Sequence, residues 1–220
     1  FRAADTHRRV MLGIPKMKET ANTQSTTTHT GAPLVAELEM YKEEFEANRR
    51  DMRELVAGLD DRRFNWRAAP GRWSIAECLA HLNVTGQVYL SAIDRGIRRA
   101  RAENPSFNDG PFRHGLFGRL FIRAIEPPAK LKVKAPKLVV PLPEHLLAVT
   151  LPASMSLHDQ LIRRLHEANG LDLARVKVTS PISKFFKFSL GHAFAITAAH
   201  ERRHLWQARG VRNDPNFPPP

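Results

Sequence analysis

The chain has 220 residues, 42% of them hydrophobic, which suits one globular domain with a sizeable core. No run of 18 apolar residues occurs, so we expect no membrane insertion, and the single cysteine, Cys78, favours a reducing, cytoplasmic compartment. The net charge of +12 attracts anionic partners, but no interleaved aromatic residues or nucleic-acid motif accompany it, so nucleic acid is a disfavoured partner.

Residues 1–32 are predicted to form a tail outside the fold. The segment 20–30 is rich in Thr and Ser, which is typical of disorder, and the residues before Met17 lack the apolar segment of a secretory signal. We therefore expect the globular domain to span residues 33–210, with a Pro-rich tail at residues 211–220.

The first two helices have clear sequence signals. Apolar residues spaced three and four apart predict a helix that starts after Pro33 and runs to about Gly58. The second helix is predicted to begin after Ser74, because Ser74 and Glu77 form a capping box, and to end at Asn104-Pro105. Its apolar residues indicate a broadly buried helix.

A long connection rich in proline follows, at residues 105–152, and only a short helix at residues 116–125 is predicted inside it. It overlaps the basic segment Arg95–Lys137, which has eleven Lys or Arg residues against three Asp or Glu residues. We interpret this segment as a solvated surface, with anion binding as the alternative.

The third helix is expected to begin near Ser156, where Ser156 and Asp159 form a second capping box, and to stop at Asn169-Gly170. The fourth is expected to run from about Ser183 to Arg209 and to stop at Gly210. Four long helices with almost no strand predict an all-α four-helix bundle, with the long crossover between the second and third helices.

Two histidines on the fourth helix point to chemistry. His200 and His204 are four residues apart, so their imidazoles lie on one face of the helix, and that face also carries the apolar Ala193 and Ile196. Two neutral imidazoles in a core are costly without partners, and a metal ion supplies a partner to both. The alternative is a pair of buried histidines satisfied by neighbouring polar groups.

His81 is the natural third ligand. It lies about two turns into the second helix, on the flank of Cys78 and Thr85, and a bundle can bring that flank opposite the fourth helix. Three neutral histidines with an open position suit a catalytic Zn²⁺, and Ni²⁺, Mn²⁺ or Fe²⁺ are also compatible. Cys78 itself is interpreted as a core residue.

The run His200-Glu201-Arg202-Arg203-His204 also matches the helix of zinc proteases, in which the glutamate is the general base. Such proteases take their third ligand from downstream, but the sixteen residues after His204 contain neither His nor Glu. We therefore reject a peptidase and keep Glu201 as a candidate base, with a solvated carboxylate as the alternative. His158 is a candidate for supporting the ligands, and His192 is interpreted as structural.

These motifs resemble a known family. Trp73-Ser-Ile-Ala-Glu-Cys-Leu-Ala-His81-Leu resembles the second-helix signature of the DinB-like proteins, and His200-x-x-x-His204-x-x-Gln207 resembles their last helix. The resemblance covers approximately residues 34–210. It implies a four-helix bundle with a long crossover, a divalent metal ion held by His81, His200 and His204, and a homodimer. Characterised relatives include S-transferases that use bacillithiol or mycothiol, but this chain departs from shorter members through its basic crossover.

Two functions follow as hypotheses. The first is a metal-dependent enzyme acting on a small-molecule substrate, either a thiol S-transferase that uses a low-molecular-weight thiol or a hydrolase that needs a base such as Glu201. The second is a non-catalytic metal-binding bundle that binds a partner, such as nucleic acid, through the basic segment Arg95–Lys137.

Overall fold

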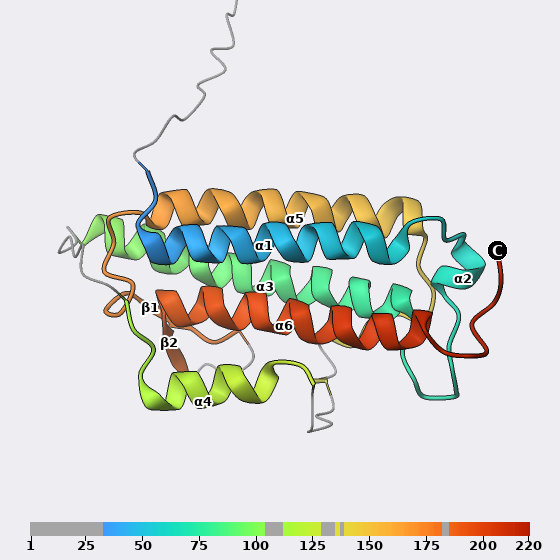
Figure 1. Ribbon diagram of the computed structural model, residues 1–220. Coiled ribbons are helices and arrows are strands. Elements are labelled where there is room, and N and C mark those ends of the chain that lie inside the picture. Colours follow the sequence, from blue (N-terminus) through green and yellow to red (C-terminus); the bar gives the residue numbers. More distant parts are fainter. Residues whose placement is uncertain (1–32, 104–111, 129–134, 137–138, 182–184) are drawn as a thin grey trace, which may run out of the picture. The chain divides into compact units, whose positions relative to one another are not determined.

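The computed structural model describes residues 33–103, 112–128, 135–136, 139–181 and 185–220 (Figure 1). The predicted tail at residues 1–32 and the stop signal Asn104-Pro105 lie outside the described residues, as does much of the basic crossover.

Four long helices confirm the all-α bundle (Figure 1). They are α1 (Ala36–Val56), α3 (Ile75–Ala102), α5 (Leu147–Ala168) and α6 (Leu190–Arg212). Both α1 and α3 pack against α5 and α6, so α1 and α3 occupy opposite corners of the bundle. No helix in the described part of the chain is long and apolar enough to cross a membrane.

Shorter elements surround the four helices. A single helical turn, α2 (Asp61–Phe64), follows α1, and α4 (Leu116–Ile125) lies in the crossover and packs along α6 (Figure 1). Two short strands, β1 (Lys177–Thr179) and β2 (Lys187–Ser189), form an antiparallel pair in the connection between α5 and α6.

The start of α3 confirms the predicted capping box. Ser74 Oγ accepts a hydrogen bond from the Glu77 backbone N–H at 3.1 Å, and Glu77 Oε2 accepts one from the Ser74 backbone N–H at 2.8 Å. The Glu77 carboxylate also receives both Nε and Nη2 of Arg67, each at 2.8 Å. These contacts fix the first turn of α3, and they therefore set the position of His81 along the axis of the bundle.

The predicted start of the third helix was wrong by nine residues, or about two and a half turns. Helix α5 begins at Leu147, so the supposed capping residue Ser156 lies in mid-helix, and Asp159 instead pairs with Arg49 at 2.7 Å. Pro152, which the sequence analysis placed in the connection, lies inside α5 although it cannot donate a backbone hydrogen bond. Burial of the inner face of this turn, including Thr150 and Ser154, outweighs that loss.

The predicted bounds of the fourth helix were also wrong. Helix α6 begins at Leu190 after the cap Ser189, because residues 187–189 pair with β1. The helix continues through Gly210 to Arg212, whose guanidinium donates to the carbonyl oxygens of Glu54, Leu55 and Ala57 at the end of α1. That tertiary contact extends the helix beyond the local stop signal.

The core has two apolar clusters, one toward each end of the bundle. The second cluster joins the end of α1, the start of α3 and the end of α6, and Phe64 of α2 is fully buried in it. Trp66 meets Phe217 edge to face there, with ring centroids 5.4 Å apart. The candidate histidines lie beside this cluster.

Candidate metal centre

Two neighbouring helices bring His81, His200 and His204 together. His81 comes from α3, and the other two come from successive turns of α6. One ring nitrogen from each histidine lies within 4.8 Å of the others, and the Nε2 atoms of His81 and His200 are 3.4 Å apart. Two nitrogen ligands of a tetrahedral Zn²⁺ are separated by about 3.3 Å, so this pair already has the spacing of two ligands.

The crossover fixes the orientation of His81. His81 Nδ1 donates a hydrogen bond to the carbonyl oxygen of Val139 at 2.6 Å, because a carbonyl can only accept. The remaining nitrogen, Nε2, then carries a lone pair that faces His200. An imidazole held in this way by a backbone carbonyl is the usual support of a metal-binding histidine.

The His204 ring is buried, and one of its two nitrogen atoms has no hydrogen-bond partner among the residues described. Its Nδ1 atom is inaccessible to water and has no hydrogen-bond partner among the residues that the structure describes. The side chain of His204 is only 8% exposed. A buried nitrogen without a partner costs free energy, and a cation bound at that nitrogen would remove the cost.

All three rings are held in the neutral form. Burial lowers the pKa of His81, although the hydrogen bond to Val139 offsets part of the effect. Burial, reinforced by the other histidines and Arg203, lowers the pKa of His200 to about 3 and that of His204 to about 2. Neutral imidazoles present lone pairs, which is the state that a metal ligand requires.

Trp73 forms a wall of the group and was not singled out as a site residue from the sequence. Its ring centroid lies 4.9 Å from that of His81 and 5.7 Å from that of His204. Its position just before the cap of α3 was the signal that could have identified it, because it lies eight residues, or about two helical turns, before His81. Val139 offered no such signal, because it lies in an aperiodic segment.

Glu201 lies in a separate contact network in the centre of the bundle. Its Oε2 atom accepts a hydrogen bond from Asn48 Nδ2 at 2.9 Å and lies 3.3 Å from Nε2 of His158. All three side chains are at most 4% exposed. The predicted alternative of a solvated carboxylate is therefore wrong, because Glu201 is buried between α1 and α5.

The other singled-out residues have structural contacts. Cys78 is fully buried in the second apolar cluster, and burial raises the pKa of its thiol. His192 Nδ1 lies 2.6 Å from the Ser189 hydroxyl at the start of α6. These contacts agree with a core role for Cys78 and a structural role for His192.

The side chains fit a divalent cation. Three neutral nitrogens converge from two rigid helices, one ring is oriented by a backbone carbonyl, and one ring nitrogen is buried without a partner. A three-histidine group of this kind in a mostly helical bundle, with His81 and His204 buried and His200 half-buried, could hold a metal ion.

Comparison with known protein families agrees with the fold. The model of the DinB superfamily matches residues 44–208, and the chain therefore belongs to this superfamily. No curated protein and no solved structure matches the chain. Family membership and the three-histidine group together fit a metal-dependent enzyme.

Proposed function

We propose that the three-histidine group binds a catalytic divalent cation, with Zn²⁺ the best suited, and that the protein is a metal-dependent enzyme acting on a small molecule. The convergence of three neutral ring nitrogens within 4.8 Å carries this proposal. A cation bound there would act as a Lewis acid and lower the pKa of a coordinated water or thiol.

The surrounding residues would prepare the ligands. Val139 holds the His81 ring in one tautomer, and Trp73 covers the rings of His81 and His204 with an apolar surface. Excluding water on that side strengthens electrostatic interactions at the site. Glu201 as a general base is the weaker part of the proposal, because its carboxylate contacts Asn48 and His158.

Thiol transfer is the better supported reaction. A thiol has an unperturbed pKa of about 8.5 and needs less help from a protein base than water does. The contacts of Glu201 therefore favour a thiol S-transferase over a hydrolase. We also propose the homodimer and the cytoplasmic location on the grounds given by the family resemblance and the single cysteine.

The proposal is tested by metal analysis of protein purified without an affinity tag. We expect about one divalent ion per chain in the wild type. The Zn²⁺ affinity of His204→Ala should be weaker than that of the wild type by about tenfold or more. The matched control is His166→Ala, which removes an exposed histidine of α5. A screen for thiol transfer with low-molecular-weight thiols then separates the catalytic role from the structural alternative.

Two outcomes would contradict the proposal. Wild-type protein that takes up no metal ion on titration would exclude the metal centre. Metal-loaded protein that transfers no thiol, but loses its fold when the metal ion is removed, would favour the non-catalytic bundle.

A further inference from the structure

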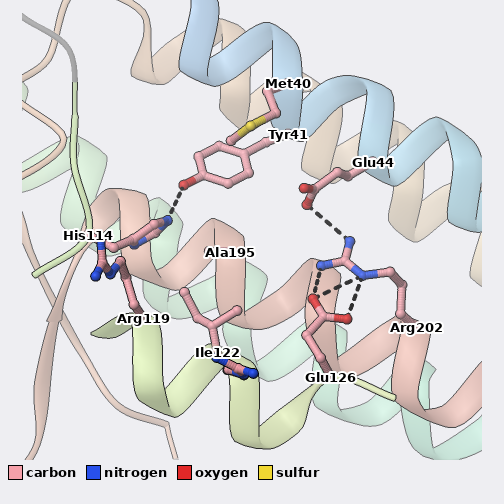
Figure 2. A pocket seen from close by; sticks show the side chains of 10 residues that line it. Met40, Tyr41, Glu44, His114, Arg119, Ile122, Glu126, Ala195 and Arg202 are labelled. Atoms are coloured by element: carbon pink, nitrogen blue, oxygen red, sulfur yellow. Dashed lines mark hydrogen bonds and ion pairs between the residues drawn. The ribbon is translucent and has the colours of Figure 1, made fainter. Parts of the chain in front are cut away.

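A cavity of about 300 Å³ lies between α1, α4 and α6, away from the three histidines (Figure 2). Ala195 and Arg202 line it from α6. Arg202 is about 200° around the helix from His200, so the cavity and the histidine group lie on opposite faces of α6. The volume is at the lower end of the range for small-molecule sites.

One side of the cavity is formed by Arg202, which is paired with two carboxylates. Arg202 Nη1 donates to Glu44 Oε2 at 3.1 Å, and Arg202 Nε lies 3.1 Å from each carboxylate oxygen of Glu126 (Figure 2). At another side, the Tyr41 hydroxyl and His114 Nε2 are hydrogen-bonded at 3.0 Å. Arg202 is therefore already neutralised by two carboxylates, so its charge is unavailable to a ligand.

Arg119 and Arg123, unlike Arg202, are not paired with carboxylates among the residues described. They are four residues apart on α4, so they lie on the same side of that helix, and both line the cavity. Both side chains are exposed, and neither has a hydrogen-bond or ion-pair partner among the residues described. Two unpaired guanidinium groups repel each other, and an oxyanion between them relieves the repulsion and accepts charge-assisted hydrogen bonds.

The rest of the lining is partly apolar. Met40, Ile122 and Ala195 face the cavity from its three helices. A fully hydrated inorganic ion would gain nothing from these side chains, whereas a ligand with an apolar body would bury surface against them. The cavity therefore combines a cationic rim with apolar walls.

We propose that this cavity binds a small organic oxyanion, a carboxylate or phosphate monoester with an apolar body. Its charged group lies between Arg119 and Arg123, and its body packs against Met40, Ile122 and Ala195. This second ligand site does not depend on the metal centre, because the two sites share no side chain.

The test is calorimetric titration of the full chain with benzoate, phenyl phosphate and the neutral benzyl alcohol. We expect saturable binding of at least one anion, and Arg119→Ala/Arg123→Ala to weaken it by about tenfold or more. The relative affinity of benzoate and phenyl phosphate identifies the preferred charged group. Met40→Trp, which fills the cavity from a half-exposed position without changing charge, is expected to weaken binding as well.

The matched control is Arg50→Ala/Arg163→Ala. It removes the same charge from two exposed arginines of α1 and α5 that do not line the cavity. Unchanged binding in this control, with unchanged thermal melting in all variants, supports the proposal. Absence of saturable anion binding, equal binding of benzyl alcohol, or an equal loss in the control overturns it, whatever the metal content of the protein.

Discussion

At the scale of single residues, the buried carboxylate of Glu201 illustrates how this core tolerates charge. A lone carboxylate in a protein interior is costly, and Glu201 meets an amide of α1 and an imidazole of α5. Burial lowers the pKa of His158, but the neighbouring Glu201 carboxylate and the hydrogen bond to the Ser154 carbonyl outweigh it, so the pKa is raised overall. The contact between His158 and Glu201 therefore links α5 to α6.

Replacing this histidine tests the pair. His158→Gln is expected to lower the free energy of unfolding by about 1–3 kcal/mol, because Glu201 loses a cationic partner in the core. Since the pKa of His158 is raised in the folded state, its contribution is full below about pH 6.5 and is lost as the pH rises through the folded value. Urea unfolding of both proteins, measured from about pH 5.5 to about pH 8.5, gives the difference. A difference that does not shrink with rising pH would contradict the ion pair, and His166→Gln on the exposed face of α5 is the control.

At the scale of elements, α4 packs against α6 through a close contact between the backbone of Gly118 and the ring of His192. A Cβ atom added at Gly118 would lie 1.7 Å from Nε2 of His192, so only glycine allows this approach. The ring of His192 in turn meets that of His114, with centroids 4.7 Å apart. Burial lowers the pKa of both rings, so they pack as neutral groups at neutral pH.

Gly118→Ala is therefore expected to displace α4 from α6. The overlap with His192 should cost about 1–3 kcal/mol, although alanine is the better helix former. Hydrogen exchange followed by mass spectrometry should show that the α4 amides exchange faster in Gly118→Ala than in wild type, with α1 as the internal reference. The control is Gly210→Ala in α6, where the added Cβ meets no atom within 4 Å and stability should be unchanged or slightly higher. Equal protection of α4 in wild type and Gly118→Ala would show that the ring simply moves aside.

At the scale of the whole molecule, the candidate metal centre links segments that are distant in the sequence. His81 belongs to α3, His200 and His204 belong to α6, and Val139 ties the crossover to His81. A cation bound only by the folded chain stabilises all of these segments at once.

Zn²⁺ should therefore raise the stability of the entire bundle. At a free concentration of about 100 times the dissociation constant, the expected gain is about 2.7 kcal/mol. Thermal melting with and without Zn²⁺ measures it, and chelation should reverse the shift. His81→Ala should abolish the response, whereas His166→Ala should retain it. A similar shift in His81→Ala would mean that the ion binds elsewhere.

The local sequence determined the helical class, the capping box at Ser74 and the inward face of α6. These features depend on neighbours within a few residues, where spacing and side-chain chemistry are sufficient. The same local logic failed at Ser156 and Gly210, where burial of the inner face of α5 and the contacts of Arg212 with α1 outweighed the start and stop signals.

Only the tertiary structure decided which groups surround the histidines. The carbonyl of Val139 reaches His81 across 58 positions of the sequence, and Asn48 reaches Glu201 across 153. No periodicity carries information over such separations, because they are set by how the helices pack and where the crossover returns. The cavity beside Arg119 and Arg123 has the same origin, since it exists only because α4 lies against α1 and α6.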